Sequence, residues 1–287
     1  MNSENRVLAC VDQSKFADHV ADYAAWAAQR LDAPMELLHV INRHPELSDS
    51  DDLSGAIGFN AQEKLLSQLS EEDEARSREA REQGRIFLNR LRERALAAGA
   101  PWVDVRQRHG ELAETLVELE PSVRLIVLGR RGRSAEATQR DLGRNVEHVV
   151  RSLRCPILAV TEPFRPPRNI MVAFDGGMST RRGIERVATS PLFRGMPVHI
   201  LMSGKRKSDA AKQLQWAEQR LASAGFSPTV ELLPGDAERI IAQSISDRAI
   251  DILVMGAYNH SPLRSALFGS KTSDLLRSSR IPTLLLR

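Results

Sequence analysis

The sequence contains no run of about 18 apolar residues, the length that a helix needs to cross a bilayer. It has only two cysteines, Cys10 and Cys155, and neither lies in a spacing typical of metal sites. The N-terminal stretch MNSENRVLACVDQ lacks a basic region followed by an apolar core, so we expect no secretory signal. These absences predict a reduced, cytoplasmic protein with structural thiols.

Charge of one sign is also scarce, because the formal net charge is only +3. That balance is too small to predict nucleic-acid binding by itself. The chain also lacks the GxSxG, HExxH and CxxC motifs and the Walker lysine loop. We therefore do not expect the protein to be an enzyme. At most, we expect a weak ATPase activity.

What the sequence does contain is an internal repeat. RVLACVDQS near the N-terminus matches RNIMVAFDG farther along, with Asp12 and Asp175 directly after an apolar run. VRLIVLGRRG matches IDILVMGAYN, and the apolar parts end on Gly129 and Gly256. Together with the third match described next, this shared order indicates a tandem duplication.

A third match extends the repeat to the end of each copy. GRNVEHVVRSLRCPILAV (143–160) aligns with GSKTSDLLRSSRIPTLLL (269–286). Between the copies, TEPFRPPR (161–168) carries three prolines and is typical of a linker. A chain of 287 residues is long enough for the two domains that this predicts, at 1–161 and 168–287.

Apolar and amphipathic segments alternate within each copy, which predicts βαβ units and a parallel sheet. Near-continuous apolar runs such as LIVLG and ILVMG fit strands that are buried on both faces. In the second copy we expect strands at 170–174, 197–202, 229–233, 251–256 and 282–286. The helices expected between them lie at 180–190, 207–224, 236–248 and 270–279.

The first copy carries an insertion at about 42–70, whose polar, poorly periodic sequence predicts a loop or a frayed helix. A long charged helix should follow at about 70–98, with Ser70 and Asp73 resembling a capping box. Its expected buried stripe consists of Leu88, Leu91, Ala95 and Ala98.

The repeat order, the aspartate after the first strand and the glycine-containing loops resemble the universal stress protein family in its tandem form. Nucleotide-binding members of that family carry G-x2-G-x9-G-[ST] between the fourth strand and the last helix. The second copy matches this spacing with Gly256, Gly269 and Ser270, while Asn259 stands at the second glycine. Asn tolerates the left-handed backbone better than most residues, so this departure is compatible with the motif.

The resemblance implies two tandem Rossmann-like domains of the adenine nucleotide alpha hydrolase-like type. Each would be a five-stranded parallel sheet in the order 3-2-1-4-5, flanked by helices. In the family, the last strands pair across a two-fold axis. CPILAV (155–160) and IPTLLLR (281–287) would then pair within this chain as a pseudo-dimer, and a homodimer of chains is a further expectation.

A phosphate site in the second copy is also physically reasonable, because a helix N-terminus presents unpaired N–H groups and partial positive charge. Gly269 allows an anion to approach the backbone closely. Ser270, Lys271 and Thr272 add two hydroxyl groups and one charge at the first turn. The resemblance places Asp175 beside the adenosine, and the end of the second strand, at Met202, would flank the same pocket.

The same residues have a purely structural interpretation. Gly256 and Gly269 could serve only a strand exit and a helix start, with Ser270 as the helix cap. Asp175 could simply cap the turn or helix that follows it. Both interpretations remain open at the level of sequence.

The first copy departs further from the motif. Gly129, Gly132 and Gly143 have a second gap one residue longer, and Arg144 stands where Ser or Thr is expected. Two interpretations compete: Arg144 blocks the phosphate position in a degenerate site, or the arginines bind a different anion. We favour the degenerate site, because an anion site needs convergent geometry as well as arginines. The arginines concerned are Arg130, Arg131, Arg133, Arg140, Arg144, Arg151 and Arg154.

Together these observations predict a universal stress protein whose C-terminal domain binds ATP or a related adenine nucleotide, with Mg²⁺. It would act as a stress-response signalling or protective module through protein partners that the sequence does not identify. The alternatives are a nucleotide-free interaction scaffold and a slow ATPase. We expect neither a membrane nor a nucleic acid as a partner.

Overall fold

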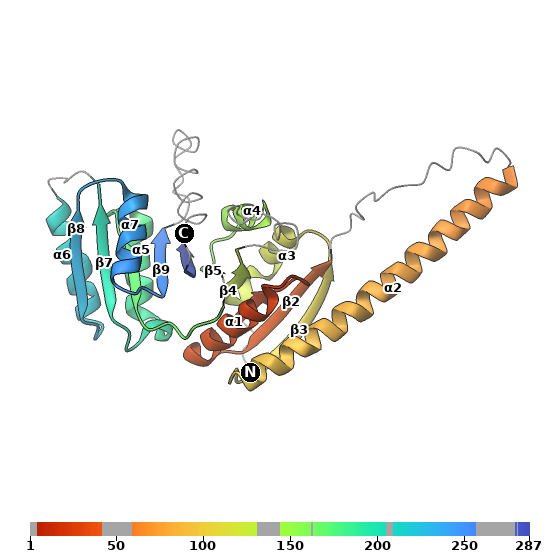
Figure 1. Cartoon of the computed structure of the whole chain (residues 1–287), viewed down its shortest axis with the longest axis horizontal. Coiled ribbons are helices and arrows are strands. Elements are labelled where there is room, and N and C mark those ends of the chain that lie inside the picture. The colour runs from red at the N-terminus through yellow and green to blue at the C-terminus, as the bar shows by residue number, and fades with distance from the viewer. Residues whose placement is uncertain are drawn as a thin grey trace.

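The computed structural model describes residues 5–41, 59–130, 144–161, 163–204, 209–256, 279 and 281–287, without the side chains of 59–77, 144, 145 and 147. In these parts of the chain, ten strands form one continuous sheet. Its order is β3-β2-β1-β4-β5-β10-β9-β6-β7-β8 (Figure 1). The strands of the first copy are β1 (Arg6–Cys10), β2 (Met35–Ile41), β3 (Val103–His109), β4 (Val123–Gly129) and β5 (Ile157–Val160). Those of the second copy are β6 (Ile170–Ala173), β7 (Val198–Ser203), β8 (Pro228–Leu233), β9 (Ile252–Gly256) and β10 (Thr283–Leu286).

Each half of the sheet has the predicted order 3-2-1-4-5 with parallel neighbours. The two halves join where β5 and β10 pair antiparallel, with Leu158 opposite Leu284. This pairing confirms the expected pseudo-dimer within one chain. It also removes two apolar edge strands that would otherwise be open to other chains.

The core lies on both faces of the sheet and continues across the seam between the copies. Because side chains alternate along a strand, Val7 and Ala9 face one layer of helices, while Leu8 and Cys10 face the other. The first layer contains α1 (Ala17–Leu31), α2 (Phe59–Ala97), α5 (Met178–Thr189) and α6 (Ala210–Ala222). The second layer contains α3 (Leu112–Leu119), α4 (Arg144–Ser152) and α7 (Ala237–Asp247).

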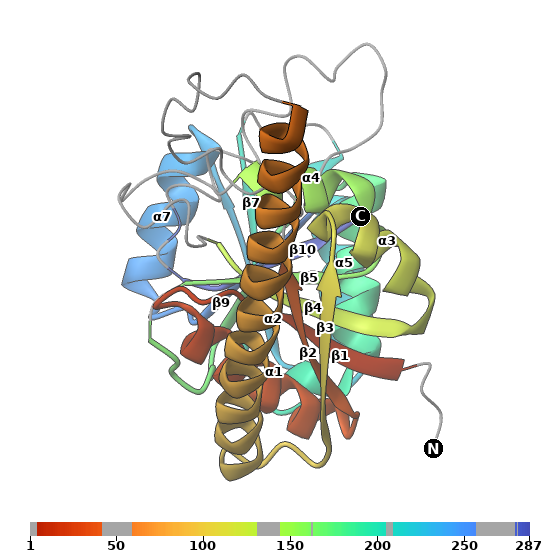
Figure 2. The ribbon, with the colours of Figure 1, turned by 90° about the vertical axis from the view of Figure 1, so that its right-hand side faces the viewer.

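The long helix α2 corrects two sequence expectations. It begins at Phe59, so Ser70 and Asp73 lie inside a helix and do not form a capping box at its start. The segment FNAQEKLLSQL contains neither glycine nor proline, and most of its residues favour a helix, so the helix continues through Ser70. Figures 1 and 2 show the N-terminal part of α2 extending beyond the sheet, while its C-terminal part lies along β3.

The packed face of α2 is close to the prediction. Leu88, Leu91 and Ala95 are buried, as expected, but Ala98 is exposed. The helix ends at Ala97, and the chain turns at Gly99, whose φ is +92°. Ala98 therefore lies on the turn and not on the helical stripe, and Ala100 is the next buried residue.

The remaining elements lie close to their predicted positions. In the second copy, the described helices and strands begin and end within a few residues of the expected bounds, while the helix expected at 270–279 lies outside the described residues except for Ser279. Cys10 ends β1, whereas Cys155 lies two residues before β5 instead of on it. Both thiols are free.

Candidate functional site

The strand order of the second copy reverses between β6 and β9. From β6 the chain proceeds to β7 and β8 on one side, and then crosses back to β9 on the other. In open parallel sheets, ligands bind at the carboxyl ends of the strands at such a switch point. Two predicted site residues lie there: Asp175 shortly after β6, and Gly256 at the end of β9.

Asp175 lies at the N-terminus of α5, exposed to solvent. Its Oδ1 atom accepts hydrogen bonds from the backbone N–H of Gly177 at 2.8 Å and from the Thr180 hydroxyl at 2.6 Å. A carboxylate is favourable there because of the partial positive charge of the helix end. Oδ1 thus caps the turn that precedes α5, as the structural interpretation of Asp175 predicted. Oδ2 accepts no hydrogen bond from the residues that the structure describes.

Gly256 is in close contact with the same turn of α5. A Cβ at this position would lie 3.1 Å from Cβ of Ser179 and 3.3 Å from Cγ2 of Thr180. Thr180 therefore connects Asp175, through its hydroxyl, with Gly256, through its methyl group. This close approach gives Gly256 a packing reason to be glycine, whether or not it contacts a ligand.

The loop after β6 is supported by side chains that the sequence analysis did not identify. The Nε atom of Arg181 donates to the carbonyl oxygen of Gly176 at 3.1 Å, and its guanidinium lies 4.6 Å from the ring centroid of Trp216. Trp216 in turn stacks on Phe174 at 6.4 Å. Gly176 has a φ of +77°, and a Cβ there would overlap the Gln213 side chain on α6. The Gly176-Gly177 pair was the one sequence signal of this tight loop.

Met202 lies near the end of β7, where its side chain is buried in the same core layer as Phe174. The backbone N–H of Phe174 donates to the carbonyl oxygen of Leu201 at 2.9 Å, which brings the ends of β6 and β7 together. The other residues predicted for this site lie outside the described residues: Asn259, Gly269, Ser270, Lys271 and Thr272.

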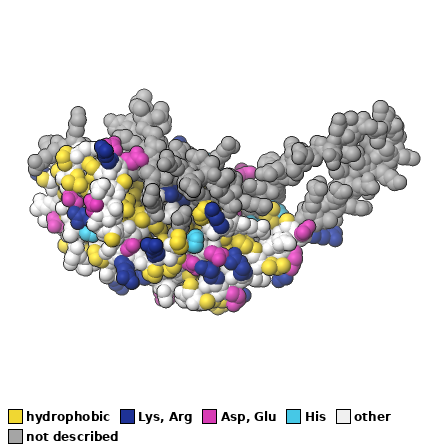
Figure 3. Space-filling view, viewed as in Figure 1, with side chains coloured by type: hydrophobic (Ala, Val, Ile, Leu, Met, Phe, Trp, Pro, Cys, Tyr) yellow, Lys and Arg dark blue, Asp and Glu magenta, His cyan; other side chains and the backbone are white. Residues whose placement is uncertain are grey.

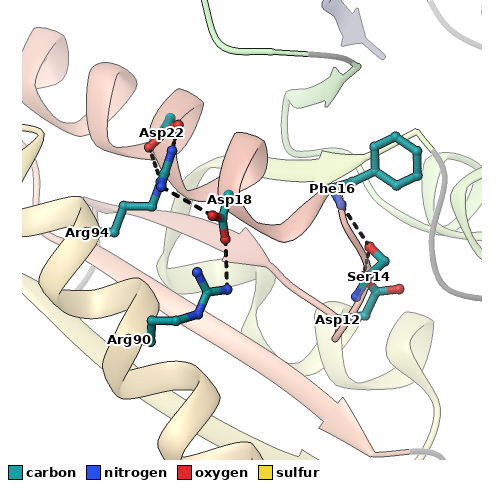
Figure 4. A network of polar contacts seen from close by, with 7 residues as sticks. All are labelled: Asp12, Ser14, Phe16, Asp18, Asp22, Arg90 and Arg94. Carbon is teal, nitrogen blue, oxygen red and sulfur yellow. Dashed lines mark hydrogen bonds and ion pairs between the residues drawn. The ribbon is translucent and has the colours of Figure 1, made fainter.

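The corresponding position of the first copy is built differently. Oδ1 of Asp12 accepts hydrogen bonds from the backbone N–H and the hydroxyl of Ser14, at 3.3 and 2.5 Å (Figure 4). The strand registers place His39 where the second copy has Met202. Its Nδ1 lies 2.9 Å from the carbonyl oxygen of Val11, and its ring meets Phe87 edge to face at 5.5 Å.

Arg130 shows what one of the loop arginines does in the first copy. It is 7% exposed, and its Nη1 donates to the backbone carbonyl of Ser279 in the second copy. This arginine is therefore engaged at the seam between the copies. Arg131, Arg133, Arg140 and the side chain of Arg144 lie outside the described residues.

Two broader properties concern the described residues alone. They contain no group of three or more His, Cys, Asp and Glu side chains arranged to hold a metal ion. No helix among them is both long enough and apolar enough to span a membrane. On the face seen in Figure 3, the basic and acidic side chains that the structure describes are interspersed.

Comparison with known proteins agrees with this architecture. The family model described as "Universal stress protein family" matches residues 4–161 and again residues 167–287. Universal stress protein Slr1230 of Synechocystis sp. is 35% identical over 284 residues, which cover 98% of this chain and 99% of that protein.

Two solved structures share the fold. A universal stress protein from Archaeoglobus fulgidus superposes with a TM-score of 0.69 at 17% identity, covering 98% of this chain and 96% of that chain. A putative universal stress protein from Pseudomonas aeruginosa superposes with a TM-score of 0.63 at 16% identity, covering 98% and 92%.

Proposed function

The chain belongs to the universal stress protein family, as a tandem of two such domains, and we propose that its second domain binds ATP or a related adenine nucleotide. The proposal places the domains at 1–161 and 168–287. Binding would change the surface around the loop that follows β9, and thereby the contacts with protein partners in a stress response. The proposal also places the protein in the cytoplasm, where its two thiols remain reduced.

The observation that carries this proposal is the placement of Asp175 and Gly256 together at the switch point of the second half-sheet. Asp175 keeps an exposed carboxylate at the edge where parallel sheets bind ligands. In the proposed complex, Asp175 and the backbone end of β7 at Met202 contact the adenosine. The tight loop held by Arg181 and Trp216 keeps the carboxylate in place before a ligand arrives.

The phosphates are assigned to the loop after Gly256 and to the start of the last helix. Asn259, Gly269, Ser270, Lys271 and Thr272 would supply backbone N–H groups, hydroxyls and one positive charge. The described residues offer no cluster of carboxylates for a metal ion. In the proposed complex, the phosphates of the nucleotide are therefore the ligands of Mg²⁺, and the ion enters the site together with the nucleotide.

We propose that the first domain does not bind the nucleotide. His39 replaces Met202 on the adenosine side, and Arg130, the first residue after the fourth strand, is committed to a carbonyl of the other domain. The expected consequence is one nucleotide per chain. A nucleotide-free scaffold is the main competing function, and the packing role of Gly256 is the observation that favours it.

The test replaces Gly269 by Val, with the equivalent change Gly143→Val in the first domain as the matched control. Isothermal titration with ATP and Mg²⁺ should show about one site per chain in the wild type. Gly269→Val should abolish binding while the circular dichroism spectrum is retained, and Gly143→Val should bind as the wild type does. Equal affinity in all three proteins, or no binding in the wild type, would overturn the proposal in favour of the scaffold.

A further inference from the structure

The sheet ends at β3, whose outer edge has no strand beside it in the part of the chain that the structure describes. The backbone N–H of Met35 on β2 donates to the carbonyl oxygen of Trp102 at 2.9 Å. In a parallel pair, every second residue of a strand directs its backbone groups to the same neighbour, so Trp102 and every second residue after it face β2. The backbone groups of Val103, Val105 and Gln107 therefore point outward, away from the sheet.

One of these outward groups is already engaged. The Nε atom of Arg92 on α2 donates to the carbonyl oxygen of Val103 at 3.1 Å. This contact agrees with the outward direction of Val103, and it protects the start of the edge from pairing. The described residues make no such contact with the outward backbone groups of Val105 and Gln107. The middle of the edge thus offers unpaired donors and acceptors.

The helix α2 accompanies this edge in the opposite direction to β3. Arg92 lies at the level of Val103, and a Cβ on Gly84 would lie 2.4 Å from Nε2 of Gln107. Figure 2, which views the molecule from this end of the sheet, shows β3 beside α2. The side of α2 that carries Arg92 therefore lies next to the open backbone groups.

That side of α2 carries a row of arginines. Residues that are 7 or 11 positions apart on an α-helix lie on nearly the same side, so Arg85 and Arg81 share the side of Arg92. Arg90 and Arg94 lie on another side of the helix, where they form ion pairs with aspartates of α1. The edge of β3 is thus bordered by positive charge that α1 does not neutralise.

The arginines of this row are accessible to a partner. Arg81 is exposed and forms no ion pair with the residues that the structure describes. Arg85 lies 2.7 Å from Glu82, but their side chains are 63% and 54% exposed, and such surface pairs contribute little. The other positions on this side of α2 are Asn89 and Leu96, so no carboxylate balances the row there.

Apolar side chains are exposed at the same place. The described residues include six large apolar side chains that are exposed, and three of them lie here: Leu96, Trp102 and Val105, at 37%, 51% and 40%. Val105 lies on the same face of β3 as Val103, the face packed against α2, but α2 covers it only in part. Covering these side chains would remove apolar surface from water and so favour a complex.

We propose that the outer edge of β3, together with Arg81 and Arg85, binds an acidic extended segment of a protein partner, which adds to the sheet as a further strand. The outward backbone groups of Val105 and Gln107 would form main-chain hydrogen bonds with it, the usual source of affinity in strand addition. The two arginines would bind carboxylates on the face of the added strand that lies toward α2.

The charges disfavour two other occupants. Pairing the β3 edges of two copies of this chain about a two-fold axis would place both arginine rows side by side, where they repel each other. A nucleic acid would contact the arginines through its phosphates, but it would leave the outward backbone groups and the exposed apolar side chains unused. An acidic peptide strand uses all three features at once.

This surface is distant from the proposed nucleotide site. Six strand spacings separate β3 from β9, which corresponds to about 29 Å. The inference therefore goes beyond the proposed function, and either can fail without the other. Gly269→Val should accordingly bind the peptide described below as the wild type does.

The test begins with a library of random twelve-residue peptides displayed on phage and selected on the full chain. The selected peptides should be enriched in aspartate, glutamate and β-branched residues. The most strongly selected peptide is then synthesised with a fluorophore, and its binding is followed by anisotropy. No selected binder, or binders without an excess of acidic residues, would overturn the proposal.

Two double variants test the arginines at equal net charge. Arg81→Gln combined with Arg85→Gln should weaken binding of that peptide by about tenfold or more, because charged hydrogen bonds are lost. The matched control combines Arg182→Gln with Arg239→Gln, two exposed arginines of the second domain, and should bind as the wild type does. Equal affinity in both double variants would contradict the assigned surface.

The strand geometry is tested from both partners. Val105→Pro removes an outward N–H that β2 does not use, and proline is tolerated at such edge positions, so binding should be lost while the fold is retained. If this variant does not fold, two peptides methylated on alternate backbone nitrogens give the same information. Only one of the two should lose binding, because an added strand directs every second N–H toward β3. Equal binding of both methylated peptides would exclude strand addition.

The other occupants have their own signatures. Binding of a random-sequence DNA duplex that the Arg81/Arg85 double variant loses and Val105→Pro retains would identify a nucleic-acid surface instead. A dimer in sedimentation analysis that Val105→Pro dissociates would identify a second copy of the chain as the occupant. Either result would overturn the proposal.

Discussion

Arg130 of the first domain donates a hydrogen bond from Nη1 to the backbone carbonyl oxygen of Ser279 in the second domain. A reciprocal contact runs from the second domain to the first: Nη1 of Arg287 donates to the carbonyl oxygen of Arg151 and, at 3.0 Å, to that of Leu153. Leu153 and Ser279 occupy equivalent positions in the repeat. Each domain thus supplies an arginine to a backbone carbonyl group that lies shortly before the last strand of the other domain.

Removing these arginines should destabilise the chain unequally. Arg130→Met leaves a buried carbonyl group without its donor, and we expect a loss of about 1–3 kcal/mol in the free energy of unfolding. Arg287→Met acts at a more exposed position and should cost about 0.5–1 kcal/mol. Urea denaturation measures both, with Arg182→Met as an exposed control that stays within about 0.5 kcal/mol of the wild type. Equal effects in all three variants would contradict the assigned contacts.

Replacing Asp175 should separate ligand binding from stability. Asp175→Ala removes the acceptor of the Gly177 N–H and of the Thr180 hydroxyl, so we expect about 1 kcal/mol of destabilisation. In the proposed complex it also removes a contact to the ligand, and the affinity for ATP should fall by about tenfold or more. The matched change is Asp12→Ala in the first domain, which should leave ATP affinity unchanged. A fall in affinity caused by Asp12→Ala instead would move the site to the other domain.

The ion pairs that attach α2 to α1 should give a pH-dependent stability. Oδ1 of Asp18 lies 2.8 Å from Nη2 of Arg90, and Oδ2 of Asp18 lies 3.2 Å from Nη1 of Arg94 (Figure 4). Arg94 also forms an ion pair with Asp22. A hydrogen bond from Arg90, helped by the charges of both arginines, lowers the pKa of Asp18. A carboxyl whose pKa is lowered by folding stabilises the fold above its unfolded pKa, and this stabilisation is lost as the pH falls through the folded value.

Asp18→Asn should therefore reduce the free energy of unfolding by up to about 1 kcal/mol at pH 7 and at pH 5, since the pair is partly exposed. The difference from the wild type should shrink below a pH of about 4. Urea denaturation at several pH values tests this, with the exposed Asp104→Asn as the control. A difference that persists unchanged to pH 3 would exclude the ion pairs as its cause.

Both thiols should be unreactive in the folded chain. Burial raises the pKa of Cys10 to about 12, and burial together with Glu120 raises that of Cys155 to about 12. At pH 8 only about one thiol in ten thousand would then be ionised. In denaturant, a chromogenic thiol reagent should react rapidly with two thiols per chain. In the folded chain, the same reaction should be slow. Rapid native labelling would show that the seam near Cys155 opens.

Much of the fold could be predicted because its physical determinants are local and repeated. Apolar strands such as LIVLG and ILVMG must be buried on both faces, and two copies of one pattern fix the same topology twice. The pairing of β5 with β10 followed from the resemblance to the family, whose last strands pair with each other, and from two apolar edges that need a partner. The start of α2 was predicted wrongly, at about residue 70 instead of Phe59. Ser70 resembles a helix cap only when the helix-forming residues before it are ignored.

The candidate site was predicted less completely. Asp175 was identified from its position after a strand, but its contact with Thr180 depends on the path of the chain after Gly176. The reason for glycine at position 256 depends on how closely α5 approaches β9, a distance that the sequence does not encode locally. Arg130 has its partner in the other copy, so its role appears only when the two halves are assembled.

The most direct test of the central claim is to purify the full chain without added nucleotide, denature it, and quantify the released small molecules by mass spectrometry. The account predicts about one adenine nucleotide per chain, and none from Gly269→Val prepared in the same way. Two nucleotides per chain would show that the first domain also binds. If no ligand is released and ATP does not bind on titration, the nucleotide-binding function is contradicted.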